Sequence, residues 1–204
     1  MSNIQKEFTT ELHGVRHGGA RREGEKLIIE ILTQAETATG VQAHEWAFLP
    51  SCELVFSPEL LEYCKSNVCG NYNKSWVCPP VCESMEEQRE KILSFENVFV
   101  FTTMHKLEDS FDFEGMTHGR ELHTSLTIEF KKRAASPVYG AGSCPACDFC
   151  AFPSPCAFPE KKLGSIEAAG INVTELSKAA GIAYNNGPNT VTFFSMALLD
   201  RQAD

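Results

Sequence analysis

Residues 97–104 read "NVFVFTTM", a run of β-branched and aromatic residues that is typical of a buried strand in the middle of a sheet. Helical patterns stand on both sides of it. The preceding segment, "SMEEQREKILSFE", offers Ser84 as N-cap and two glutamates in the first turn. The following segment, "GRELHTSLTIEFKKRAA", is long enough for a helix of several turns. The run therefore predicts an interior strand with helices packed against its sheet.

Further predicted helices and strands surround this strand. Residues 23–39 have apolar side chains at helical spacing, and residues 57–67 predict a short helix with Ser57 as N-cap. A last helix is expected to start after Thr174 and to end at Gly181. The other expected strands are residues 44–51, 136–143 and 189–200. This alternation predicts an α/β or α+β fold, in which a small central sheet is flanked by helices.

The connecting segments are predicted to be loops. Residues 108–116, "EDSFDFEGM", are acidic and are expected to form a solvated loop. Ser165 and Glu167 are expected to make local loop or cap hydrogen bonds. Two long cysteine-rich loops, residues 64–82 and 144–156, stand out, since loops of such length are uncommon unless they have a function.

The domain organisation follows from these patterns. Residues 1–24 are polar, rich in histidine, glycine and arginine, and without clean periodicity, so they predict a flexible N-terminal arm. Residues 25–204 contain no linker and no repeat at a fixed period. A chain of 204 residues is long enough to bury a core without disulfides. We therefore expect a single metal-binding domain over residues 25–204.

Composition excludes several classes of partner. The net charge of −9 argues against non-specific binding to nucleic acid or to an anionic membrane, because both require basic patches. The N-terminus has no apolar segment of the kind that directs secretion, and the longest apolar runs are too short to cross a bilayer. We therefore expect a cytoplasmic protein that binds neither nucleic acid nor membrane.

The chain contains nine cysteines, an odd number that cannot all pair as disulfides. In a cytoplasmic protein, clustered cysteines indicate a metal site or catalysis more often than disulfides. Cys52 stands apart in an apolar, strand-like segment and is expected to be a buried free thiol. The candidate metal ligands are the remaining eight: Cys64, Cys69, Cys78, Cys82, Cys144, Cys147, Cys150 and Cys156.

The second loop, "SCPACDFCAFPSPC", places its cysteines in the pattern C-x2-C-x2-C-x5-C. Thiolates at every third residue of a turning loop converge on one centre, and the pattern resembles the ferredoxin run C-x2-C-x2-C-x3-C-P. Cys156 comes two residues later than that run requires, and Ala157 replaces its proline. Zinc sites more often show two separated C-x2-C pairs. The spacing favours a [4Fe–4S] cluster and leaves zinc as the alternative.

The first loop has no standard spacing, but its residues suit a metal site. Gly70 and Asn71 tolerate left-handed turns that would aim backbone N–H groups at cluster sulfurs. Tyr72 and Trp76 could shield a cluster from water or serve as ordinary packing residues. We expect the two loops to meet in the fold, although about sixty residues separate them.

The motifs "C-x4-C-G-N-Y-x3-W-x-C-P-P", "G-A-G-x-C-x2-C-x2-C-x5-C-x-F-P-E-K" and "S-x-E-A-x-G-I-x-V" resemble an uncharacterised family of predicted metal-binding proteins, domain of unknown function 2284. The resemblance extends from about Cys64 to Leu199 and includes "LEDSFDFEGM" and "NTVTFF". It implies that seven cysteines are ligands, and it leaves Cys82 open because the corresponding cysteine varies in position.

Eight thiol ligands would suffice for two [4Fe–4S] clusters, whereas seven would leave one iron open or bound by another group. Each loop could ligate its own cluster. Alternatively, Cys156 could complete the cluster of the first loop, since in two-cluster ferredoxins the fourth cysteine of a run binds the other cluster. The sequence is compatible with both arrangements.

Three functions are compatible with these features. The first is electron transfer with a redox partner protein, because the chain has eight clustered cysteines and no recognisable substrate motif. The second is an enzyme that binds substrate or transfers sulfur at an open iron, and the third is a structural zinc module. Nothing in the sequence names a reaction, and a homodimer is compatible with it.

Overall fold

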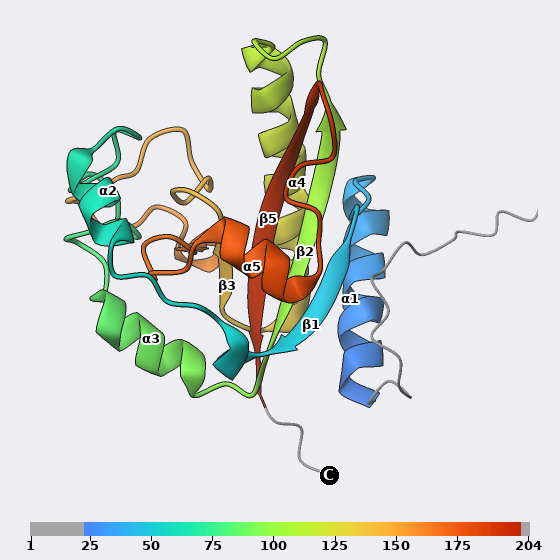
Figure 1. Cartoon of the computed structure of the whole chain (residues 1–204), viewed down its shortest axis with the longest axis horizontal. Coiled ribbons are helices and arrows are strands. Elements are labelled where there is room, and N and C mark those ends of the chain that lie inside the picture. Colours follow the sequence, from blue (N-terminus) through green and yellow to red (C-terminus); the bar gives the residue numbers. More distant parts are fainter. Residues whose placement is uncertain (1–22, 201–204) are drawn as a thin grey trace, which may run out of the picture.

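The computed structural model describes residues 23–200, which form a mixed α/β fold with one five-stranded sheet (Figure 1). The strand order is β1-β2-β5-β3-β4. The bounds of the strands are Trp46–Pro50 (β1), Asn97–Lys106 (β2), Val138–Gly140 (β3), Gly164–Ser165 (β4) and Thr190–Leu199 (β5). Strand β4 pairs parallel to β3, whereas the other pairs are antiparallel. The predicted fold class is confirmed.

Five helices pack around the sheet. Their bounds are Glu23–Thr39 (α1), Leu60–Ser66 (α2), Met85–Leu93 (α3), Phe113–Ala134 (α4) and Val173–Ala180 (α5). In Figure 1, α5 lies in front of the sheet and α4 lies behind it, while α2 and α3 lie to the β3 side. None of the helices in the described part of the chain is long and apolar enough to cross a membrane.

The side chains of β2 alternate between two hydrophobic cores, one on each face of the sheet. This agrees with the prediction that residues 97–104 form a buried interior strand. Val98 and Val100 point into a cluster that also contains Leu176 of α5. Phe99 and Phe101 point to the opposite face, where they meet Phe130 of α4 at ring separations of 5.7 and 5.1 Å. Because neighbouring residues of a strand face opposite sides, one run of apolar residues can bury both faces.

Helix boundaries agree with the sequence where a side chain caps the helix start. Ser84 caps α3 in a full capping box with Glu87, as expected. Helix α4, however, begins at Phe113, where Asp112 accepts a hydrogen bond from the Gly115 N–H. The predicted acidic loop over residues 108–116 is therefore wrong in its second half.

Three smaller boundary predictions also need correction. Helix α2 begins at Leu60 rather than next to Ser57, because tighter turns with hydrogen bonds between residues three apart cover the residues between them. Helix α5 begins slightly earlier than expected, at Val173, since Asn172 accepts from the backbone of Thr174. The predicted N-terminal arm lies outside the described residues except for its last two, residues 23–24, which belong to α1.

Cys52 is exposed, and the prediction of a buried thiol is wrong. A short 3-10 turn, Ser51–Glu53, follows β1 and breaks the alternation of the strand. Ser51 takes the buried position, and its hydroxyl donates to the carbonyl groups of Phe95 and Glu96. The turn leaves Cys52 facing solvent.

A chain of buried polar side chains links β2, α4 and β5. His123 of α4 is hydrogen-bonded through Nδ1 to Thr103 at 3.0 Å and through Nε2 to Ser195 at 2.9 Å. Thr127 bonds the same serine at 2.9 Å, and His105 extends the chain from Thr103 at 2.9 Å. Each buried group has a partner, so this network costs little stability and fixes α4 against the two strands.

The buried histidine predicts a pH-dependent stability. Burial lowers the pKa of His123 to about 3. The unfolded chain therefore binds a proton near pH 6.5 that the folded chain excludes, so stability falls as the pH drops below about 6.5. In chemical denaturation, we expect His123→Gln to reduce the slope of unfolding free energy against pH by up to about 1.4 kcal/mol per pH unit. Equal slopes for wild type and variant would contradict this.

The close pairing of β3 with β4 predicts that a side chain at Gly164 would destabilise the fold. A Cβ added to Gly164 would lie 2.4 Å from the Tyr139 ring, whereas one added to Gly140 would lie 3.9 Å from Leu163. Tyr139 is buried, so its ring cannot move freely. We expect Gly164→Ala to cost about 1–3 kcal/mol in thermal denaturation, and the control Gly140→Ala to cost much less. Equal losses would show that the close approach is unimportant.

Candidate metal centre

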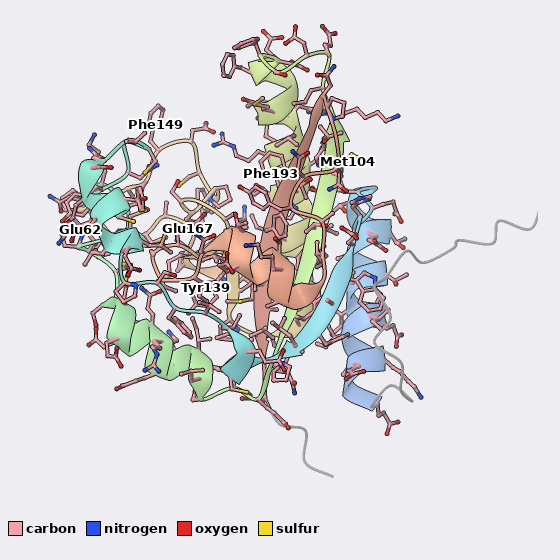
Figure 2. All side chains as sticks on the ribbon, viewed as in Figure 1. Glu62, Met104, Tyr139, Phe149, Glu167 and Phe193 are labelled. Carbon is pink, nitrogen blue, oxygen red and sulfur yellow. The ribbon has the colours of Figure 1, made fainter. Side chains whose placement is uncertain are left out.

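The two cysteine loops lie side by side on the β3 side of the sheet (Figure 1). The first begins inside α2, which carries Cys64, and ends just before α3. The second leaves β3 and returns at the short 3-10 turn Pro159–Lys161. Figure 2 shows Phe149 at the outer end of the second loop and Glu167 nearer the sheet.

Trp76 joins the two loops. Its indole Nε1–H donates to the Ser154 carbonyl at 3.0 Å, and its ring meets Phe152 edge-on with centroids 5.1 Å apart. Ser75, next to it, is buried, and its side chain acts to lower the pKa of the thiols of both Cys78 and Cys150. The prediction that the loops meet is confirmed, and Trp76 has a specific contact rather than generic packing.

The four thiols of the first loop lie near one another. Burial raises the pKa of Cys78 to about 11; a hydrogen bond with Ser75 opposes the rise, and charges on Cys69, Cys82 and Cys64 add to it. The pKa of Cys82 is likewise raised by burial and by Cys64. The charge on Cys82 therefore interacts with those on Cys78 and Cys64 of the same loop.

The second loop forms a similar group of four thiols. Burial raises the pKa of Cys147, and charges on Cys144, Cys150 and Cys156 add to the rise. The charge on Cys156 therefore reaches Cys147 of its own loop, although its spacing departs from the ferredoxin pattern. Cys144 also accepts a hydrogen bond from the Leu163 backbone N–H at 3.4 Å.

Cys150 differs from its neighbours because its surroundings favour the thiolate. Burial acts to raise its pKa, but hydrogen bonds from the backbones of Phe152 and Trp76 and from Ser75 outweigh it, so the pKa is lowered. Two of these donors come from the first loop. N–H and O–H donors around a sulfur stabilise the deprotonated form, which is the form that binds metal.

Two charged residues border the groups. Lys131 of α4 donates to the Lys162 carbonyl and lies close enough to Cys144 for their charges to interact. Glu167 accepts from the Gly142 N–H at 2.8 Å, just before the second loop, and its charge helps to raise the pKa of Cys64, after burial and Cys69.

Glu167 makes the expected local bond, because it accepts from the Ser165 hydroxyl at 3.3 Å, and its other interactions reach Gly142 and Cys64. For Ser165 the prediction is also confirmed, since its hydroxyl accepts from the Ala168 N–H at 3.1 Å. No sequence signal pointed to the contact with Gly142, because that residue stands 25 positions away in the chain.

The donor set suits thiolate-ligated metal. Two groups of four thiols match the ligand count of two [4Fe–4S] clusters, and each group alone also matches a zinc site with four cysteine ligands. Within residues 23–200, no three His, Cys, Asp or Glu side chains are arranged so that they could hold one metal ion. The sulfurs are thus neighbours without being gathered at a single point.

Comparison with known proteins gives one match. A family model described as "Predicted metal-binding protein (DUF2284)" matches residues 47–199, about three quarters of the chain. This stretch includes both cysteine loops and four of the five helices. No curated protein and no solved structure matches the chain.

The difference in pKa between Cys78 and Cys150 predicts a difference in their rates of alkylation. In the reduced, metal-free protein near neutral pH, we expect iodoacetamide to modify Cys150 at least about tenfold faster than Cys78, because only the thiolate reacts. Peptide mapping by mass spectrometry measures both rates. Ser75→Ala should slow the reaction of Cys150, whereas the exposed control Ser66→Ala should not. Equal rates at Cys150 and Cys78 would contradict the contacts described above.

Proposed function

Because the chain belongs to this family of predicted metal-binding proteins, we propose that it is an iron–sulfur protein with two [4Fe–4S] clusters that transfers electrons. The observation that carries the proposal is that the eight cysteines form two sets of four, one in each loop, within which the charges of the thiols interact. In this proposal each loop ligates its own cluster, and Cys82 and Cys156 are the fourth ligands of the two sites.

Iron–sulfur chemistry is favoured over zinc by the spacing and by the sulfur contacts. Three cysteines at every third residue suit a cluster whose iron corners face several directions, whereas zinc sites usually combine two separated pairs. Cys82 contacts the Gln88 amide Nε2 at 3.7 Å, and Cys144 accepts from Leu163. Hydrogen bonds to ligand sulfurs are one means by which proteins set cluster potentials.

The position of the two groups supports electron transfer. Ser75 contacts one thiol of each group, so clusters bound there would be close neighbours. Val68 and Phe149, each beside a ligand cysteine, are 92% and 90% exposed. We propose that a redox partner protein approaches the clusters where these apolar side chains are exposed.

Anaerobic metal analysis tests the cluster assignment. We expect about eight iron and eight acid-labile sulfide ions per chain, with the brown absorption of [4Fe–4S] clusters that bleaches on reduction. Inductively coupled plasma mass spectrometry and a sulfide assay on the same sample measure both. A colourless protein that contains zinc and lacks sulfide would overturn the proposal and establish the zinc alternative.

Paired cysteine variants test which thiols share a cluster. If each loop ligates its own cluster, Cys147→Ala should remove about half of the iron, and adding Cys156→Ala should remove no more. Adding Cys69→Ala instead should remove nearly all of it. In the crossed arrangement, Cys156 completes the cluster of the first loop, so the pair Cys147→Ala and Cys156→Ala would already lose both clusters. The exposed Cys52→Ala is the matched control and should retain full iron content.

A further inference from the structure

A cavity of about 570 Å³ opens between α4 and the second cysteine loop. Its volume lies within the range of small-molecule sites, about 300–1,000 Å³. The exposed side of α4 forms one wall, with Arg120 and Thr124 among its residues, and the second loop forms the opposite wall. Ser75 of the first loop closes one side.

The thiols of the second group line this cavity. Cys144, Cys147 and Cys150 contribute to its surface, whereas none of the first loop's cysteines does. A molecule held in the cavity would therefore lie against the second metal centre alone. Since that centre already has four thiols, the molecule would contact it from outside the metal coordination shell rather than through an open iron.

Some of the charged side chains that line the cavity form ion pairs, and others do not. Glu129 is held by Lys132 at 3.0 Å and by Arg133 at 2.7 Å. Arg120 and Lys161 also line the cavity, and neither forms an ion pair with a carboxylate of residues 23–200. Lys161 instead lies 4.8 Å from the centre of the Phe158 ring.

Two carboxylates and two hydroxyls complete the polar wall. Asp148 and Glu121 also line the cavity and act against an anion, so they balance Arg120 and Lys161, and an anionic group would be held there by direct pairing with a guanidinium rather than by an excess of positive charge. The hydroxyls of Thr124 and Ser125 donate to carbonyls of their own helix, so toward a ligand they act as acceptors. Such a wall would accept hydrogen bonds from hydroxyl or amino groups of a ligand.

We propose that this cavity binds a small polar molecule through a carboxylate or phosphate group that pairs with Arg120, and that it presents the rest of the molecule to the second metal centre. The guanidinium group offers two parallel N–H donors that match the oxygens of such a group. The site stands on the cavity and its charges, and only the chemistry that follows binding rests on the proposed function.

Calorimetric titration of the anaerobically purified, full-length protein tests the site. The probes are malonate, glycolate, inorganic phosphate and phosphoglycolate. We expect at least one to bind with millimolar affinity or better, and Arg120→Gln to weaken that binding by at least about tenfold, as loss of a charge-assisted pair does. Arg120→Lys should lose less. The matched control is Arg89→Gln, on α3, which should bind as the wild type does.

Two results would overturn the site: none of the four probes binds the wild type, or Arg120→Gln binds as tightly as the wild type. Circular dichroism of each variant checks that it is folded. Iron and sulfide are measured on the same samples, which separates the two proposals. Binding by protein that lacks iron would uphold the site and contradict the iron–sulfur assignment, whereas iron-loaded protein without binding would contradict the site alone.

Discussion

Strands β2 and β5 pair antiparallel from Asn97 opposite Leu199 to Lys106 opposite Thr190, and both cysteine loops depend on this register. Helix α3, which follows the first loop, leads directly into β2. Strand β3, which leads into the second loop, pairs with β5 through Gly140 opposite Ser195. Shifting the register by one residue would exchange the two buried faces of the sheet, so the two apolar cores hold the loops in place from a distance.

Because eight thiols lie on one side of the domain, ionising them is unfavourable, and the surrounding residues offset this only in part. Most of the thiols whose pKa values shift are made more reluctant to ionise, by burial first and by one another second. Cys150, with donors from both loops, and the nearby Lys131 act in the opposite direction. Metal binding would displace the thiol protons, and the metal charge would offset the repulsion between the resulting thiolates, so metal uptake and ordering of the loops should be coupled.

Local patterns predicted the secondary structure, because alternation in β2 and the capping box at Ser84 depend on neighbouring residues alone. What they missed depends on contacts between distant residues. The exposure of Cys52 results from a turn stabilised by carbonyl groups beyond α3, and the contacts of Glu167 reach the segment after β3. Which metal site Cys156 completes likewise depends on how residues 144–156 fold back, and spacing alone leaves that open.

The central claim is that each loop ligates its own iron–sulfur cluster and that the two clusters lie close together. Diffraction from crystals of anaerobically purified protein, recorded on both sides of the iron absorption edge, tests it most directly. We expect two separate groups of anomalous peaks, one bounded by the cysteines of residues 64–82 and the other by those of residues 144–156. A single cluster shared by both loops, or peaks at the zinc edge in their place, would contradict it.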